Sequence, residues 1–187
     1  MRPSKIEDQP LLEGLMSVLR SKGYDGASLN ELAGSSGLQK ASLYHRFPGG
    51  KKEITAAVLD YANQWVYKNI YLLLSDESVA PHERLARVID NINMLYDDGQ
   101  EVCILRALSL DTGIDLFGED IKKSMQHWIA GFAALGLSFG FSEEVAQRKA
   151  LQVLTSIQGS LVVSRGLGST DAFSSALVFI RAIYQPT

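Results

Sequence analysis

Apolar residues recur at helical spacing along most of this chain of 187 residues, and that periodicity limits its fold more than any other feature. One stripe stands at positions i, i+3, i+4 and i+7, which places it along one side of a helix. It consists of Leu12, Leu15, Met16 and Leu19. No stretch alternates convincingly between apolar and polar residues, as a half-buried strand does. The most strand-like stretch, residues 161–163, lies within a helical period and is interpreted as buried helix. The predicted fold class is all-α.

Capping and breaking residues divide this pattern into about nine helices. Ser28 and Glu31 have the spacing of a capping box, and Asp8, Ser142 and Asp171 are expected N-caps of three other helices. Glycines are expected to end several of them. The expected helices span about 8–23, 29–35, 39–47, 51–74, 82–98, 101–110, 119–136, 143–165 and 171–184.

The composition is that of a globular protein, with 46% hydrophobic and 21% charged residues. No apolar run reaches the roughly 18 residues that a membrane-spanning helix needs, and the first residues do not resemble a signal peptide. The single cysteine, Cys103, excludes an internal disulfide framework and suits a reducing compartment. We expect a cytoplasmic protein without membrane association.

Charge is unevenly distributed along the chain, although the net charge is only −3. Residues 1–52 contain eight basic and five acidic side chains, whereas residues 53–187 contain ten and sixteen. A mildly basic N-terminal part can approach phosphate groups while the acidic remainder keeps the protein in solution. By itself this asymmetry is a weak indication of nucleic-acid binding.

Two short helices separated by Gly37 and followed at once by a long helix have the layout of a helix-turn-helix. In the second short helix, Leu43 and Phe47 fall on nearly the same side and are expected to face the core. Ala41 and His45 then face away from the core, with Ser42 and Tyr44 on the flanks. Small and polar groups on an exposed helix side suit entry into a DNA major groove.

Residues 23–33 and 36–48, read together, resemble the DNA-binding signature of the TetR family of transcriptional regulators. Residues 47–51, which read Phe-Pro-Gly-Gly-Lys, are similar to the LmrA/YxaF-like subgroup of that family. The similarity covers about residues 11–60, and a weaker similarity to the subgroup's penultimate helix lies at residues 156–161.

This resemblance implies a repressor that binds a two-fold operator as a dimer and is released by a small apolar or aromatic effector. It divides the chain into a helix-turn-helix domain, residues 1–50, and a ligand-binding and dimerisation domain, residues 51–187. The residues implied in DNA binding are Ser28, Gln39, Lys40, Ala41, Ser42, Tyr44, His45, Arg46 and Lys51. Lys40, Ala41 and Ser42 would approach base edges, and most of the others would contact phosphates.

Three features depart from the family pattern. Gln39 stands where a serine cap is usual, so it either leaves the helix less well capped or itself contacts a base. Arg46 replaces a usual histidine and adds charge. Glu7 and Asp8 precede the first helix where relatives often carry basic or hydroxyl residues, which weakens one expected phosphate contact.

The resemblance also implies an effector pocket between the long helix and the later helices. Five large side chains are the candidates for its lining, although core packing is the alternative for each of them. They are Trp65, Tyr96, Met125, Trp128 and Phe132.

The last two helices are expected to form half of an intersubunit four-helix bundle, as the family implies. Their apolar stripes support this interpretation, but a monomer could instead bury the same stripes internally. The stripes consist of Ala146, Ala150, Val153, Leu154, Ile157 and Leu161, followed by Phe173, Ala176, Leu177, Ile180 and Ile183.

The sequence contains no pattern typical of a catalytic, metal or cofactor site. His45, His82 and His127 are far apart and lack metal-ligand spacing. We therefore expect no enzymatic activity, no metal and no cofactor. The rival hypothesis is a helical small-molecule-binding protein that has lost DNA binding, and only the acidic total charge and the acidic lead-in support it.

Overall fold

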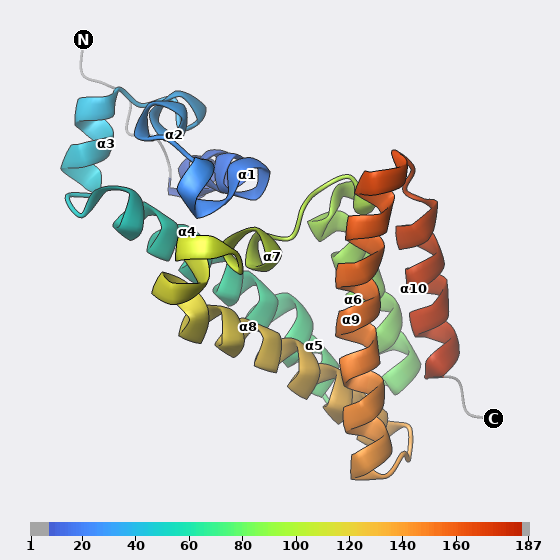
Figure 1. Ribbon diagram of the computed structural model, residues 1–187. Helices are drawn as coiled ribbons and strands as arrows, with labels where there is room; N and C mark the ends of the chain where they lie inside the picture. Colours follow the sequence, from blue (N-terminus) through green and yellow to red (C-terminus); the bar gives the residue numbers. More distant parts are fainter. Residues whose placement is uncertain (1–7, 185–187) are drawn as a thin grey trace. The chain divides into compact units, whose positions relative to one another are not determined.

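The computed structural model describes residues 8–184, and over that range the regular structure is entirely helical (Figure 1). The predicted all-α class is confirmed. Contacts divide the chain into two compact units. The first combines Met1–Ala62 with Ile104–Ile121, and the second combines Asn63–Cys103 with Lys122–Thr187. Glu7, part of the acidic lead-in, lies outside the described residues.

The first unit is built on α1 (Asp8–Gly26), α2 (Leu29–Ser35) and α3 (Lys40–Arg46). It also contains most of α4 (Gly50–Val66), α7 (Ile104–Leu108) and the start of α8 (Asp111–Ser138). Helix α1 packs against α2 and α7 and buries an apolar side formed by Leu11, Leu15, Met16 and Leu19. Leu12, which we expected in that stripe, is only half-buried.

The second unit begins with the end of α4, which continues through a π-helical turn, η1 (Tyr67–Tyr71), into α5 (Leu72–Ser75). It further contains α6 (Pro81–Leu95), the short 3-10 turn η2 (Asp97–Gly99), most of α8, α9 (Glu143–Leu167) and α10 (Asp171–Ile183). Helices α9 and α10 pack side by side (Figure 1). If the run from α4 to α5 counts as one helix, the described residues form the nine helices expected.

Local sequence explains several helix ends. The predicted capping box at Ser28 and Glu31 is present, and the Ser142 hydroxyl accepts the Val145 N–H at the start of α9. Gly23, at φ 68°, interrupts α1 where its end was expected. Asp171 was wrongly predicted as a cap, because it lies inside the first turn of α10. Its own N–H donates instead to the Ser169 hydroxyl.

The expected start of the helix at residue 119 is wrong, since α8 begins at Asp111. Glycines at 113 and 118 lower the intrinsic helix propensity of this stretch, but tertiary packing overrides them. A Cβ atom at Gly113 would lie 2.6 Å from the Leu108 carbonyl oxygen, so this glycine permits a close approach between α7 and α8.

Residues 161–163 are helical as predicted, yet only Leu161 is buried. The side chains of Val162 and Val163 are 46% and 47% exposed, so the interpretation as wholly buried helix is wrong. Within residues 8–184, no helix combines the length and apolar character needed to cross a membrane.

Candidate nucleic-acid interface

Helix α3 buries one side and exposes the rest. Leu43 is 1% exposed and Phe47, just after the helix, is 9% exposed. Burial of these two side chains fixes α3 against its unit, as the helical periodicity predicted. The six candidate contact residues on this helix are all exposed: Lys40, Ala41, Ser42, Tyr44, His45 and Arg46. The exposed side thus combines small, hydroxyl, aromatic and basic groups, which can approach base edges and phosphates.

Gln39 is the N-cap of α3 and is exposed. Its backbone has the extended conformation of a capping residue, but its side chain makes no capping hydrogen bond. The replacement of the usual serine therefore leaves α3 without a side-chain cap. The Gln39 side-chain amide is exposed and can hydrogen-bond to a molecule bound at α3.

Ser28 sits at the start of α2 and is already engaged with Glu31. Its hydroxyl accepts the Glu31 N–H at 3.3 Å and donates to Glu31 Oε2 at 2.7 Å, while its own N–H donates to that carboxylate at 3.1 Å. Lys22 forms an ion pair with the same glutamate. The hydrogen bond from Lys22, with those from Ser28, lowers the pKa of Glu31 to about 2. A DNA phosphate would have to share the Ser28 hydroxyl with Glu31.

Lys51 is half-buried in the first turn of α4. Its Nζ lies 4.5 Å from the centre of the Tyr24 ring and donates a long hydrogen bond, 3.5 Å, to the Asp25 carbonyl oxygen. Close by, the Glu53 carboxylate accepts the Gly49 N–H at 2.6 Å. An acidic side chain therefore already satisfies one N–H at the start of α4, where an anion would otherwise bind.

The five candidate effector residues all lie in the second unit. Trp128 and Phe132 are buried on α8 with their rings stacked, 6.4 Å between centres. Tyr96 is buried against Phe173 of α10, 5.9 Å between ring centres. Trp65 on α4 and Met125 on α8 are half-buried.

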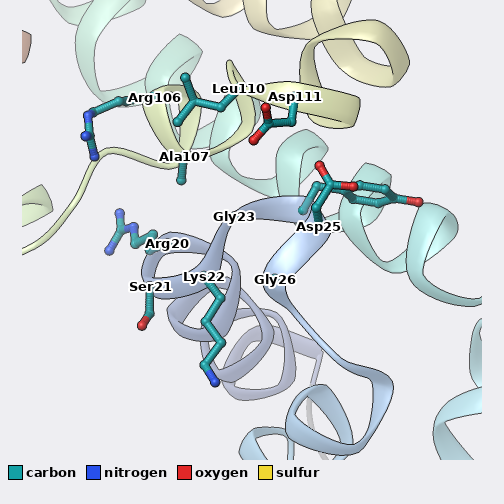
Figure 2. A pocket seen from close by; sticks show the side chains of 11 residues that line it. Arg20, Ser21, Lys22, Gly23, Asp25, Gly26, Arg106, Ala107, Leu110 and Asp111 are labelled. Atoms are coloured by element: carbon teal, nitrogen blue, oxygen red, sulfur yellow. The ribbon is translucent and has the colours of Figure 1, made fainter.

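None of these five residues lines either of two hollows within the described part of the chain. One, of about 230 Å³, lies in the first unit between the end of α1 and the α7–α8 turn (Figure 2). Its lining mixes basic and acidic groups, with Arg20 and Arg106 toward one side and Asp25 and Asp111 toward the other (Figure 2). The second, of about 510 Å³, lies in the other unit beside the α9–α10 turn.

The apolar stripes assigned to the dimer interface are buried within the chain. Apart from the half-buried Ile183, every residue of those stripes is buried, because α9 and α10 pack against each other. The two stripes are therefore buried within a single chain, which was the alternative to burial between subunits. A different set of apolar residues is exposed on them: Leu151, Val162, Val163, Leu167, Val178 and Phe179.

No group of three or more potential metal ligands occurs among the residues that the structure describes. Cys103 is buried. His127 contacts the rings of Tyr67 and Tyr71, with ring centres 5.1 and 5.6 Å away. Burial and the neighbouring Lys123 lower the pKa of His127.

Sequence reasoning missed the side chains that hold Lys51. Tyr24 and Asp25 lie inside the recognised signature, yet no periodicity or spacing marks them as partners of a residue 26 positions later. Asp25 also accepts the Thr112 N–H through Oδ2 at 3.1 Å. The only available signal was an aromatic residue directly after Gly23, which by itself indicates core packing.

The candidate interface lies within a region that is similar to known proteins. Residues 11–58 match the protein-family model described as "Bacterial regulatory proteins, tetR family". The HTH-type transcriptional regulator YxaF of Bacillus subtilis is 26% identical over 160 residues, which cover 83% of each chain. The HTH-type transcriptional regulator LmrA of the same organism is 21% identical over 160 residues, covering 83% of this chain and 85% of LmrA.

A solved structure supports the fold over nearly the full chain. A TetR transcriptional regulator from Legionella pneumophila superposes with a TM-score of 0.79, covering 96% of this chain and 97% of its own. The two sequences are 20% identical, so this likeness concerns the fold alone.

Proposed function

Because this chain belongs to the TetR family of DNA-binding transcriptional regulators, we propose that it is a ligand-responsive repressor. It binds a two-fold operator as a homodimer and is released by a small apolar or aromatic effector. The helix-turn-helix domain, residues 1–50, contacts DNA, and residues 51–187 bind the effector and the second subunit.

The exposed side of α3 carries this proposal. Leu43 and Phe47 fasten the helix, and its remaining side chains face outward, which is what a recognition helix in a major groove requires. In this arrangement Lys40, Ala41 and Ser42 contact base edges. Tyr44, His45 and Arg46 contact phosphates, as do Lys51 and Ser28, and the Gln39 amide is near enough in sequence to join the base contacts.

Two copies of the chain associate through the exposed apolar sides of α9 and α10. Such a patch on two neighbouring helices is typical of a protein interface, and a four-helix bundle formed from two helices of each subunit buries it. The dimer then presents two recognition helices to half-sites about one DNA turn apart.

Effector binding acts as a two-state switch. The effector binds the released state more tightly than the DNA-bound state, and this difference in affinity sets how far the equilibrium moves. Helix α4 carries the change, because it begins beside the candidate interface and its last residues belong to the second unit. Trp65, Tyr96, Met125, Trp128 and Phe132 are the proposed effector contacts.

DNA binding is tested by selecting a duplex from a random pool and measuring its affinity by gel shift at two salt concentrations. We expect affinity to fall steeply with salt, because cationic side chains displace counterions. Lys51→Ala should weaken binding and reduce the salt slope by about one, and Tyr44→Ala should weaken it as well.

Lys68→Ala is the matched control, since it removes an exposed lysine of the second unit and should leave the salt slope unchanged. Absence of salt-dependent binding to every duplex would contradict the repressor function and favour a small-molecule-binding protein without DNA contacts. For the release step, compounds that raise the thermal unfolding midpoint are added to the gel shift. Unchanged DNA affinity at saturation by every such compound would contradict that step.

A further inference from the structure

The Lys51 ammonium contacts two residues at the end of α1, Tyr24 and Asp25. It lies over the face of the Tyr24 ring at 4.5 Å and donates to the Asp25 carbonyl oxygen. An ammonium group has three N–H donors. One faces the ring and one faces the carbonyl, so a third is left for an outside acceptor.

We propose that Tyr24 is a positioning residue for Lys51, whose remaining N–H donor it directs toward a DNA phosphate oxygen. This inference rests on the proposed function, because contact between Lys51 and phosphate is part of that function. A lysine side chain loses much rotamer freedom when it is fixed. A side chain that is already fixed before binding loses less conformational entropy when the complex forms. Preorganisation of this kind raises affinity.

The Tyr24 ring is itself held from the start of α8. Its edge-to-face contact with Phe117 has ring centres 5.5 Å apart and an interplanar angle of 65°. Asp25, the next residue, accepts the Thr112 N–H at 3.1 Å. Figure 2 shows Asp25 and Asp111 on the same side of the hollow between α1 and the α7–α8 turn. Two separate contacts therefore fix the position of the ring beneath Lys51.

Backbone geometry at Gly23 places Tyr24 in this position. Gly23 has φ 68°, a region that disfavours other residues. A Cβ atom there would lie 3.2 Å from the Ala107 carbonyl oxygen. The turn that directs the ring toward Lys51 thus requires glycine and is packed against α7.

The test measures the affinity of the full chain for a labelled duplex of the selected sequence, by fluorescence anisotropy. Tyr24→Leu removes the aromatic face and is expected to weaken binding about two- to fivefold, the range of a partly exposed cation–π contact. Tyr24→Phe keeps the ring and should bind as the wild type does. Tyr24→Leu combined with Lys51→Ala should bind no more weakly than Lys51→Ala alone.

Loss of folding is separated from loss of positioning by a stability control. Leu12→Ala truncates a half-buried residue of the same helix; it should lower the thermal unfolding midpoint without changing affinity. If Tyr24→Leu weakens binding equally with and without Lys51, or if Tyr24→Phe fails to restore it, the positioning role is overturned. If instead Lys51→Ala binds as the wild type does, the proposed phosphate contact itself fails, which is a different result.

Discussion

At the scale of single residues, the start of α2 is stabilised by polar contacts around Glu31. The carboxylate receives hydrogen bonds from Ser28 and pairs with Lys22. Sequence alone predicted the capping box, because the Ser-x-x-Glu spacing determines that contact. The ion pair joins residues nine positions apart in different helices, and no local spacing rule covers it.

A pH dependence of stability follows from the pKa of Glu31, which lies at about 2 against an ordinary 4.5. Because folding lowers this pKa, the charged carboxylate stabilises the fold above about pH 4.5, and the contribution is lost as pH falls toward 2. We expect Glu31→Gln to lower the thermal unfolding midpoint at neutral pH, and the difference from the wild type to shrink across that acidic range.

Glu77→Gln, which changes an exposed glutamate between α5 and α6, is the control and should give a pH-independent difference close to zero. A Glu31→Gln difference that stays constant from pH 7 to the acid limit would show that the carboxylate charge is not what stabilises the cap.

At the scale of elements, the crossing of α1 and α2 depends on one glycine. A Cβ atom at Gly14 would lie 2.3 Å from the Ser35 carbonyl oxygen, a contact with backbone that cannot rotate away. Gly34, near the end of α2, has nothing within 4 Å of the corresponding position. The sequence shows two helical glycines of similar appearance, and only the packing distinguishes them.

We expect Gly14→Ala to lower the free energy of unfolding by about 1–3 kcal/mol, the usual cost of overpacking. Gly34→Ala should raise it by about 0.5–1 kcal/mol, because alanine favours the helix and meets no neighbour. Urea unfolding followed by circular dichroism measures both. Equal effects of the two substitutions would mean that helix propensity, and not the close approach of α1 to α2, decides stability here.

At the scale of the whole molecule, the decisive feature is which side of α9 and α10 remains exposed. The stripes chosen from sequence are buried inside the chain, while Val178 and Phe179 are 67% and 43% exposed. Both helices carry apolar residues on more than one side, so periodicity alone could not assign one side to the subunit interface. Packing of α9 on α10 buries one side of each helix and leaves other apolar residues of both helices exposed.

Val178→Glu is expected to convert the proposed dimer into a monomer, because it places a charge in the apolar centre of the bundle. Analytical ultracentrifugation at several concentrations measures the change, and operator affinity should fall with it. Leu137→Glu, at a position 52% exposed on α8, is the matched control and should leave the sedimentation coefficient unchanged. A Val178→Glu variant that sediments as the wild type would place the interface elsewhere.

The sequence by itself determined the all-α class, the capping box, the α2–α3 pair and the outward side of α3. These features depend on residues within a few positions of one another, where spacing and propensity act directly. Tertiary structure alone decided that Lys51 lies over Tyr24, that α8 begins at Asp111, and which side of α9 and α10 is buried. Those features depend on contacts between segments far apart in the chain. Such contacts stabilise a conformation only after the segments have packed together, so local spacing and propensity do not reveal them.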